Sequence, residues 1–466
     1  MTPQAHDNAV VELAEGFVDL ALLYNNNKAR YPFLLESVAH GGTEARYDIL
    51  FAFPQAELVL DGDGHLTSTN LEIKGNDFLD NLDRCWATNR IPIPHAENSV
   101  HHELRLPFQG GWFVYLGYEL AQQIEPVLDL PMSNDVIAYA VRIPAAIIRD
   151  HVTRRCWVIS ESNSVQQLQI MHQDISDVTP LDHFKKNLIS HIEEQPEKDY
   201  LDGVAAIRRY IVEGDVFQVN LSRQWSVSLK ENVTDYDLYY SLRNNNPAPF
   251  SGIAHFAGKS IISSSPERLV SVENGYVETR PIAGTRPRGG ELDVDQALSA
   301  ELLGHPKERA EHIMLIDLER NDMGRVCEAG SINVNELMVI ESYAHVHHIV
   351  SNIRGKLRAK ISPGEVIKAV FPGGTITGCP KIRCMEIIAE LEKSSRGAYT
   401  GSMGYLNHNG DMDLNILIRT MTRNGPKLNL RAGAGIVADS IAAHELEETR
   451  SKAKGLLRAL DTEFSQ

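Results

Sequence analysis

The sequence predicts a mixed α/β (α+β) chain with sheets covered by helices. Short apolar runs bounded by Gly, Pro, Asn and Asp recur along the whole chain, which is typical of buried strands. Longer segments between them repeat apolar residues every three or four positions, which is typical of amphipathic helices. The 466 residues are enough for one large core or for two or three domains.

In the first half, apolar runs predict strands at 31–37, 46–53, 56–66, 136–148 and 156–159, the third of these with a hairpin turn. Residues 107–118 predict a turn and a strand, followed by a helix. Helical spacing is found at 8–23 and 76–85. A polar connection spans 161–198 and contains a further predicted helix at 180–194. We place a boundary in this connection, between an N-terminal region (1–175) and a C-terminal region (195–460).

The second half has clearer patterns. Its predicted helices are 200–212, 307–318 and 442–460. Its predicted strands are 216–223, 260–266, 268–272, 276–280, 343–352, 398–406, 414–420 and 428–437.

Charge and composition exclude several classes of function. The net charge is −17, from 62 acidic and 45 basic residues, which disfavours nucleic acid as a partner because phosphate binding needs a basic surface. A local pocket can still bind an anionic substrate. No apolar run approaches the roughly 20 residues that span a bilayer, and the first residues do not resemble a secretory signal. The five cysteines lack metal-binding spacing, so we expect a reduced protein in the cytoplasm.

A glycine-rich stretch, Phe371-Pro-Gly-Gly-Thr-Ile-Thr-Gly-Cys-Pro-Lys381, is followed by a helical pattern. Glycines let a ligand approach the backbone closely, and the free N–H groups of a helix start attract anions. The stretch therefore fits a pocket for a carboxylate or phosphate. It equally fits a structural turn before a core helix, and the pattern alone does not decide between the two.

Acidic residues repeat on two predicted helices. Glu445, Glu448 and Lys452 share one helix face, and Glu308 and Glu311 lie three apart on another. Carboxylates from two helices that face one cleft would suit Mg²⁺, which prefers oxygen ligands and often bridges to an anionic substrate. The other interpretation is a pair of solvated helix faces.

Further residues in the second half could carry chemistry. Arg419 lies among apolar residues, where an unpaired charge is costly, so we expect either an internal ion pair or a bound anion. Glu267 ends a predicted strand and could be a general acid if burial raises its pKa, or simply a solvated turn residue. His347 and His348 are neighbours on a strand and point to opposite faces, so they cannot both face one site.

Several long motifs, in order, resemble the chorismate-utilising enzymes. The family includes the large subunits of aminodeoxychorismate and anthranilate synthase, and the isochorismate and salicylate synthases. The motifs are Pro281-Ile-Ala-Gly-Thr-Arg-Pro-Arg288, Arg309-Ala-Glu-His-Ile-Met-Leu-Ile-Asp-Leu-Glu-Arg-Asn-Asp322, the glycine-rich stretch, Gly404-Tyr405 with Asp411-Met-Asp413, and Arg431-Ala-Gly-Ala-Gly-Ile-Val-Ala-Asp-Ser440. The resemblance implies a sandwich of two antiparallel sheets with helices outside, and binding of chorismate with Mg²⁺.

The resemblance also implies roles for individual residues. Glu267 would protonate the departing C4 hydroxyl, and His348 would be a second acid/base or an orienting group. The Mg²⁺ ligands would be Glu311 and Glu448, with Glu445 nearby. The substrate would be held by Gly284, Thr285, Thr375, Tyr399, Arg419, Gly433, Ala434, Gly435 and Lys452.

The resemblance to individual members is divided. Water-using relatives carry Lys at the position that matches Gln218, and a neutral amide is a poor base. We therefore expect ammonia as the nucleophile, delivered by a separate glutamine amidotransferase subunit. Aminodeoxychorismate synthases carry Lys at the position of Ala283, whereas the alanine found here matches anthranilate synthases. The stretches Gln218-Val-Asn-Leu221, Thr279-Arg-Pro281, Phe371-Pro-Gly-Gly374 and Arg46-Tyr-Asp48 nevertheless favour 4-amino-4-deoxychorismate as the product.

Two alternatives remain: anthranilate synthase component I, and a non-catalytic amino-acid-binding regulator on the same scaffold. A tryptophan pocket, found in both subfamilies, is also implied by two stretches. Its residues would be Ser37, Arg46, Tyr47, Pro249, Phe250 and Ser251. The other interpretation of these residues is plain core.

Overall fold

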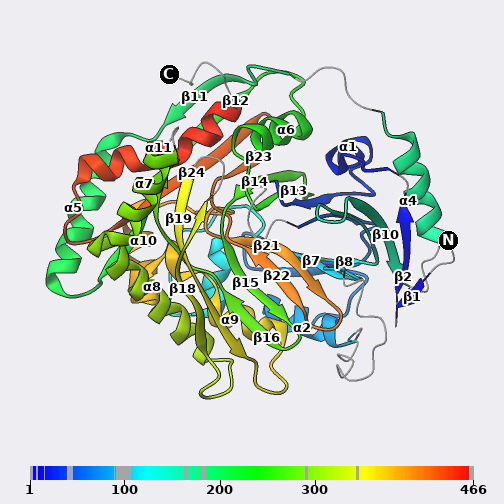
Figure 1. Cartoon of the computed structure of the whole chain (residues 1–466), viewed down its shortest axis with the longest axis horizontal. Helices are drawn as coiled ribbons and strands as arrows, with labels where there is room; N and C mark the ends of the chain where they lie inside the picture. Colours follow the sequence, from blue (N-terminus) through cyan, green and yellow to red (C-terminus); the bar gives the residue numbers. More distant parts are fainter. Residues whose placement is uncertain are drawn as a thin grey trace.

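Strands from both halves of the sequence build two antiparallel sheets in the computed structural model of the chain (Figure 1). The structure describes residues 4–6, 9–14, 16–38, 46–88, 90, 106–161, 166–179, 185–288, 292–342 and 346–460. Within these residues, no helix is long and apolar enough to cross a membrane.

The larger sheet combines six strands from the first 161 residues with later strands that join them edge to edge. Its order is β1 (Gln4–His6), β2 (Ala9–Ala14), β10 (Arg155–Glu161), β9 (Ala145–Asp150), β4 (Tyr47–Ala52), β3 (Phe33–Glu36), β13 (Phe250–Phe256), β14 (Lys259–Ser265), β23 (Thr420–Asn424), β24 (Lys427–Ile436), β12 (Gln218–Leu229) and β11 (Ile189–Glu194), with β20 (Gly378–Cys379) also on β12.

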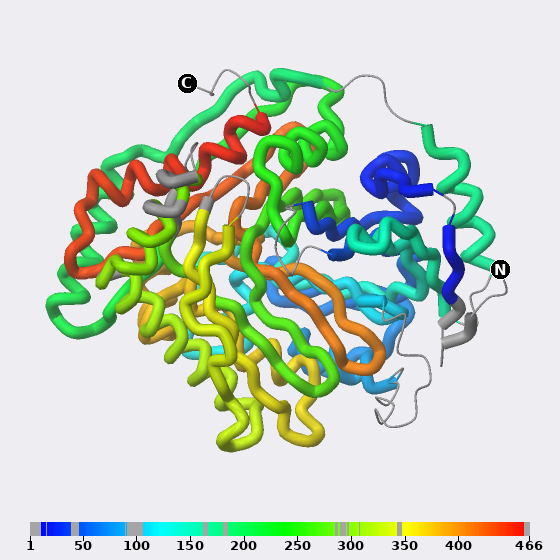
Figure 2. Tube along the Cα trace, viewed as in Figure 1, coloured from blue at the N-terminus to red at the C-terminus, as the bar shows by residue number. Residues whose placement is uncertain are grey.

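The smaller sheet is likewise made by both halves, which meet where β21 pairs with β7. Figure 2 shows this meeting as orange chain beside cyan chain. Its order is β17 (Ile282–Pro287), β19 (Val346–Lys356), β16 (Tyr276–Thr279), β15 (Arg268–Glu273), β22 (Met412–Asn415), β21 (Ser402–Asn407), β7 (Gly111–Leu116), β8 (Ala138–Ile143), β5 (Glu57–Leu60) and β6 (Leu66–Thr69), with β18 (Asn333–Ser342) also on β19.

Helices cover the outer faces of both sheets. They are α1 (Leu20–Asn26), α2 (Phe78–Thr88), α3 (Ala121–Ile124), α4 (Gln166–Asp177), α5 (Glu197–Glu213), α6 (Asp235–Asn245), α7 (Leu292–Gly304), α8 (Pro306–Gly324), α9 (Pro363–Val370), α10 (Lys381–Glu392) and α11 (Ala442–Leu460), with the short 3-10 turns η1 (Tyr118–Leu120) and η3 (Gly374–Ile376).

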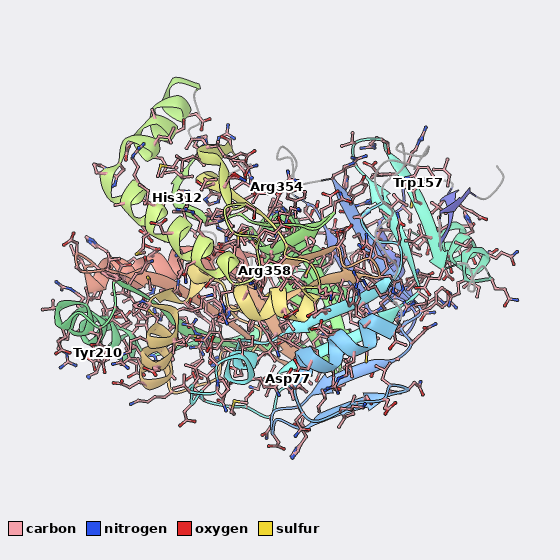
Figure 3. The ribbon with its side chains drawn as sticks, turned by 90° about the horizontal axis from the view of Figure 1, so that it is seen from below. Asp77, Trp157, Tyr210, His312, Arg354 and Arg358 are labelled. Atoms are coloured by element: carbon pink, nitrogen blue, oxygen red, sulfur yellow. The ribbon has the colours of Figure 1, made fainter. Side chains whose placement is uncertain are left out.

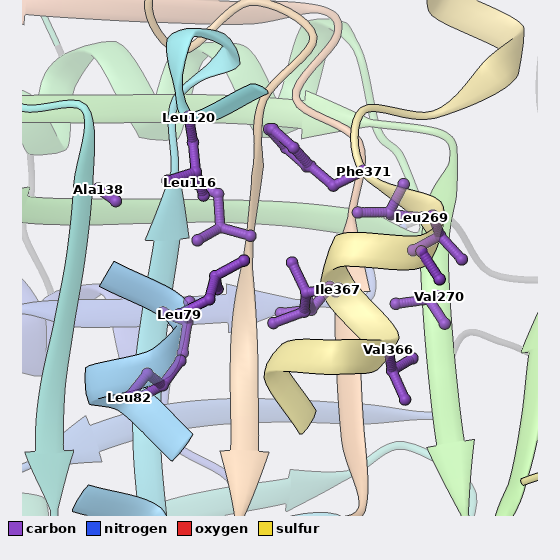
Figure 4. Packing of buried hydrophobic residues seen from close by; sticks show 14 of the residues in the cluster. Leu79, Leu82, Leu116, Leu120, Ala138, Leu269, Val270, Val366, Ile367 and Phe371 are labelled. Atoms are coloured by element: carbon purple, nitrogen blue, oxygen red, sulfur yellow. The ribbon is translucent and has the colours of Figure 1, made fainter. Parts of the chain in front are cut away.

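The core has a layer between the sheets and further layers under the helices. Between the sheets, the rings of Phe33 from β3 and Phe113 from β7 stack with centroids 4.0 Å apart. Outside the smaller sheet, Leu79 of α2 and Ile367 of α9 pack over Val270 of β15 and its neighbours (Figure 4). The predicted sandwich with helices outside is thus confirmed.

Two of the places where the chain crosses from one sheet to the other lie next to each other, and these two crossings position the site described below. Residues 266–267 connect β14 of the larger sheet to β15 of the smaller one, and residues 416–419 connect β22 back to β23. Two backbone hydrogen bonds join the crossings, from Ile416 N–H to the Glu267 carbonyl (2.9 Å) and from Ser264 N–H to the Arg419 carbonyl (3.1 Å).

Three predicted elements were wrong. Residues 8–23 do not form one helix, because 9–14 form β2, which pairs with β10, and the helix α1 begins after the N-cap Asp19. Residues 189–194, predicted as part of a helix, form β11 on the edge of β12. Pairing with an existing strand outweighed the local helical pattern in both places. The predicted strand 414–420 is interrupted by the second crossing.

A buried ion cluster fixes the end of α10 beneath the larger sheet. Glu392 bonds Arg396 (2.7 Å) and Arg431 (2.9 Å), and each of the three side chains is at most 5% exposed. Burial alone would raise the pKa of Glu392, but the two guanidinium groups outweigh it and lower the pKa. Arg396 also donates to the Asn220 carbonyl and lies over the ring of Tyr399, so the cluster supports residues of the site.

Replacing Glu392 with Gln is expected to lower the free energy of unfolding by about 3–5 kcal/mol, because two buried guanidinium groups lose their common counter-charge. Urea denaturation followed by circular dichroism measures this. Glu386→Gln on the same helix is the matched control. Its partner Arg383 is about one-third exposed, so a change below about 1 kcal/mol is expected. Equal effects of the two variants would contradict a structural role for the cluster.

Candidate functional site

A buried carboxyl group lies at the first crossing between the sheets. Glu267 is 5% exposed and its Oε1 accepts a hydrogen bond from the hydroxyl of Thr375 (2.7 Å). Burial raises the pKa of Glu267 to about 7, although the Thr375 bond and the charges of Lys452 and Arg419 act in the opposite direction. A carboxyl group with this pKa can hold and release a proton near neutral pH.

A partly buried cation, the Arg419 guanidinium, lies at the second crossing. Among the described residues, none makes a side-chain hydrogen bond or ion pair with the Arg419 guanidinium, while its charge acts on Glu267 and His348. Its φ of 51° puts Arg419 in the left-handed region, which costs about 1–2 kcal/mol for a residue with a Cβ. Of the two expectations for Arg419, an internal ion pair is not found among the described residues, and a guanidinium without such a pair fits a carboxylate of a ligand.

His347 and His348 point to opposite faces of their strand, as the alternation of side chains along a strand predicts. His347 bonds Asp295 (2.9 Å) and Ser342 (2.7 Å), away from Glu267, and is therefore structural. His348 lies on the other face, with Nδ1 3.4 Å from the Gly284 carbonyl. Burial, helped by the Arg419 charge, lowers the pKa of His348 to about 4. A neutral imidazole can accept a proton or orient a ligand at neutral pH.

Carboxylates of α8 and α11 approach one another beside β12. Burial raises the pKa of Glu311, and the negative charges of Glu308 and Glu448 add to this rise. Glu448 forms an ion pair with Lys452 (2.8 Å), whose ammonium also donates to the Gly433 carbonyl (3.1 Å). Glu445 lies one turn before Glu448, and both charges act on the Tyr200 hydroxyl of α5.

This donor set fits Mg²⁺, because the ion needs few protein carboxylates and completes its shell with water and substrate oxygens. Repulsion between the carboxylates at Glu311 would be relieved by a bound cation. Glu311, Glu445 and Glu448 do not form a closed three-ligand cage. In the described part of the chain, acidic or His ligands converge within 4.8 Å at the exposed turn of Asp61, Asp63 and His65 instead.

Gln218 occupies the space between β12 and the carboxylates. Its Nε2 donates to Glu311 Oε1 (3.0 Å), and its buried Oε1 has no hydrogen-bond partner in the described structure. A Cβ at Gly435 would lie 2.2 Å from Nε2, so a larger residue there would displace the Gln218 amide. A Cβ at Gly433 would similarly collide with the Tyr399 hydroxyl (2.7 Å). The glycines of β24 thus make room for polar side chains.

The glycine-rich stretch forms one wall of this site, between α9 and α10. Thr375 reaches Glu267, but the Thr377 hydroxyl donates to the Gly373 carbonyl (2.9 Å) and closes its own turn. Lys381 pairs with Asp322 (2.6 Å). Gly378 extends β20 along β12 beside Gln218. Both expectations for the stretch are therefore partly met, since it is a structural turn that also presents one hydroxyl to the site.

The structure brings together most of the residues predicted for catalysis and binding. Gly284 has a φ of 65° and lies beside the side chain of Glu308. Its carbonyl oxygen lies 3.4 Å from His348 Nδ1. Ala434 is buried in β24 between the two glycines. The side chain of Thr285 and residue His345 lie outside the described residues.

Two residues near the site were not singled out from the sequence. Glu319 lies two turns beyond Glu311 on α8, and Asn220 lies two residues beyond Gln218 on β12, so its side chain shares the face of Gln218. Their spacing in the sequence from Glu311 and from Gln218 could have indicated that they lie near the site. His312 of α8, labelled in Figure 3, hydrogen-bonds Ser351 (2.7 Å) and so ties α8 to β19, the strand that carries His348.

The residues predicted to bind tryptophan lie at two places in the structure. Ser37 donates to the Pro249 carbonyl (3.2 Å), and Ser251 and Phe250 begin β13, next to β3. Arg46 bonds Asp150 and lies over the ring of Tyr47 at the start of β4. Tryptophan binding at these residues stays a prediction.

A comparison with protein families matches residues 38–458 to the chorismate binding enzymes. The chain belongs to this family. It is 42% identical to aminodeoxychorismate synthase component 1 of Bacillus subtilis, over 78% of this chain and 80% of that protein. It is 37% identical to anthranilate synthase component 1 of Acetivibrio thermocellus, over 92% and 90%.

A solved structure supports the same assignment. Anthranilate synthase component I from Streptococcus pneumoniae superimposes with a TM-score of 0.79 and 31% identity, and the match covers 96% of this chain and 99% of that one. The chain is therefore a chorismate-utilising synthase. The aminodeoxychorismate and anthranilate synthases are similar to it to comparable degrees.

Replacing Thr375 with Val is expected to move the alkaline limb of the pH profile of chorismate consumption to higher pH. The Thr375 hydroxyl stabilises the ionised form of Glu267, so its loss raises the pKa of that carboxyl group further. Thr377→Val makes the same chemical change two residues away, at a hydroxyl that does not touch Glu267. If the alkaline limb of the pH profile moved equally in both variants, or in neither, the limb would not report the ionisation of Glu267.

Proposed function

We propose that the chain converts chorismate and ammonia to 4-amino-4-deoxychorismate, the precursor of p-aminobenzoate in folate biosynthesis. The ammonia would come from a separate glutamine amidotransferase subunit. The four sequence stretches named above and the 42% identity with an aminodeoxychorismate synthase component 1 support this product. The cysteines support a separate amidotransferase, because burial raises the pKa of all five thiols and none is activated as a nucleophile.

The position of Gln218 is the observation that carries the choice of nucleophile. Its amide is held against Glu311 and cannot take a proton from water, whereas a lysine there could act as a base. Ammonia needs no such activation, because its neutral form is already a nucleophile. Ala283 cannot form a covalent adduct with the substrate, so ammonia would attack the substrate directly.

Each charged group then has a role in the proposed reaction. Arg419 and Lys452 hold carboxylates of chorismate. Glu267 in its protonated form donates to the C4 hydroxyl as the C4–O bond breaks, so that water leaves and Glu267 becomes a carboxylate. Neutral His348 orients the substrate, because a group whose pKa is lowered to about 4 is a weak base at neutral pH. When bound by Glu311 and Glu448, Mg²⁺ would stabilise negative charge on the ring carboxylate.

Anthranilate synthase component I is the second candidate. Ala283 matches anthranilate synthases, and an anthranilate synthase covers more of the chain, 92%. The acid Glu267, the cation Arg419 and the carboxylates of α8 and α11 could serve the formation of either product. Only identification of the product distinguishes the two candidates.

The deciding experiment incubates the purified chain with chorismate, MgCl₂ and an ammonium salt, followed by a lyase that acts on 4-amino-4-deoxychorismate. We expect p-aminobenzoate, and no product when glutamine replaces the ammonium salt. Fluorescent anthranilate without the lyase would assign the chain to the tryptophan branch. Absence of any chorismate consumption would favour the non-catalytic regulator instead.

A further inference from the structure

Two buried side-chain oxygens on β12 have no hydrogen-bond partner in the part of the chain that the structure describes. They are Oε1 of Gln218, a residue 4% exposed, and Oδ1 of Asn220, a residue 8% exposed. The two residues are two positions apart on one strand, so their side chains share a face. A buried acceptor without a partner is costly, and beside a site it indicates a ligand that donates hydrogen bonds.

The chain holds both residues in place. Nε2 of Gln218 donates to Glu311 (3.0 Å), which directs Oε1 of the same amide away from that carboxylate. The backbone N–H of Asn220 donates to the Thr377 carbonyl (2.9 Å), and its carbonyl accepts from Arg396 (2.8 Å). These contacts fix the Gln218 amide and the backbone that carries the Asn220 side chain.

The Asn220 oxygen lies over a part of β24 that has no side chain. An atom at the Cβ position of Gly433 would be 2.8 Å from Asn220 Oδ1 and 2.7 Å from the Tyr399 hydroxyl. Oδ1 therefore points to the surface that Gly433 leaves bare, on the side of the strand where the Tyr399 hydroxyl also lies. Tyr399 and Gly433 are both among the residues expected to hold the substrate, so this oxygen faces the site.

The kind of ligand follows from the chemistry of the two oxygens. Both accept hydrogen bonds, and the carboxylates of chorismate have no hydrogen to donate. Among the reactants of the proposed reaction, the donors are the C4 hydroxyl, which is assigned to Glu267, and ammonia, which has three N–H groups. Glu267 is bonded by Thr375 and Asn220 by Thr377, so the acid and the two oxygens lie on either side of one short turn.

We propose that Asn220 binds the nucleophile: its Oδ1, together with Oε1 of Gln218, accepts hydrogen bonds from the incoming ammonia and turns the lone pair of the nitrogen towards the substrate. The inference rests on the proposed function. The lone pair forms the C–N bond as the C4–O bond breaks, and the departing oxygen takes the proton of Glu267 and leaves as water. The nitrogen keeps its three hydrogens as an ammonium group, the main form of an amine near neutral pH, so neutral amide oxygens are sufficient and no base is needed.

The experiment measures KM for the ammonium salt and KM for chorismate, at one pH, in the wild type and in Asn220→Leu. Leucine removes the acceptor, and the backbone bonds to Thr377 and Arg396 do not depend on the side chain. KM for ammonium is expected to rise about three- to tenfold, the effect of losing one hydrogen bond to a neutral group, while KM for chorismate stays within about twofold. Circular dichroism verifies folding, and Asn220→Ala, with a smaller side chain, provides the same comparison if leucine does not fit.

Asn429→Ala is the matched control, because Asn429 is exposed on β24, and both constants should stay at their wild-type values. A rise of KM for chorismate alone in the Asn220 variants would show that Asn220 faces the C4 hydroxyl and would overturn the proposal. No change in either constant, or an equal rise of both, would overturn it as well. If the wild type formed anthranilate, the proposed product would be wrong while the two constants still tested Asn220. If the wild type consumed no chorismate with ammonium, both the proposed function and this inference would fail.

Discussion

Replacing Glu267 with Gln is expected to lower kcat for chorismate consumption by about 10²–10⁴-fold, the contribution of a positioned general acid. The amide keeps the shape of the side chain and cannot donate the proton that the departing hydroxyl needs. KM should change little, because Arg419 and Lys452 remain to bind the substrate. Steady-state kinetics with ammonium salt as the nitrogen source measures both constants.

The pH dependence of the wild type follows from the same group. Burial raises the pKa of Glu267 to about 7, and the protonated form is the donor. Activity should therefore be retained on the acidic side of this range and fall as the pH rises through it. Glu273→Gln, at an exposed carboxylate on the following strand, is the matched control and should behave as the wild type. Activity of Glu267→Gln within tenfold of the wild type would remove Glu267 from the role of acid.

Replacing Glu448 with Ala is expected to abolish Mg²⁺-dependent turnover. The change removes one of few carboxylate ligands, and a loss of Mg²⁺ affinity above about 100-fold is expected, since changes behind the ligands alone cost about 10–100-fold. It also frees Lys452, which pairs with Glu448 at 2.8 Å. Isothermal titration with MgCl₂ measures the affinity without any substrate.

Glu447→Ala provides the comparison on the same helix. Glu447 is 65% exposed and bonds Arg450 on the solvent side of α11. Its loss should affect neither Mg²⁺ binding nor turnover. Unchanged Mg²⁺ affinity in Glu448→Ala would show that the ion, if it binds, is held elsewhere, and Glu311→Gln would then be the next variant to measure.

Local patterns in the sequence were sufficient for the long elements of the second half. Helices α5, α8 and α11 and strands β12, β14, β15 and β24 lie where apolar spacing predicts them, because each buries one regular stripe of side chains. The pattern failed at β2 and β11. Both lie near edges of the larger sheet, where pairing with one neighbour outweighs a weak helical preference.

The sequence by itself determined the family and the candidate residues. Long motifs in order identify the family, and the resemblance to that family implies roles for Glu267, Glu311, His348, Arg419 and Glu448. Only the tertiary structure decided how these residues act together. Glu267 and Arg419, whose guanidinium has no ion-pair partner in the described part of the chain, lie close together because two crossings between the sheets run side by side. This is a contact between positions about 150 residues apart that no local pattern encodes. Desolvation at that junction, which depends on everything packed around it, raises the pKa of Glu267.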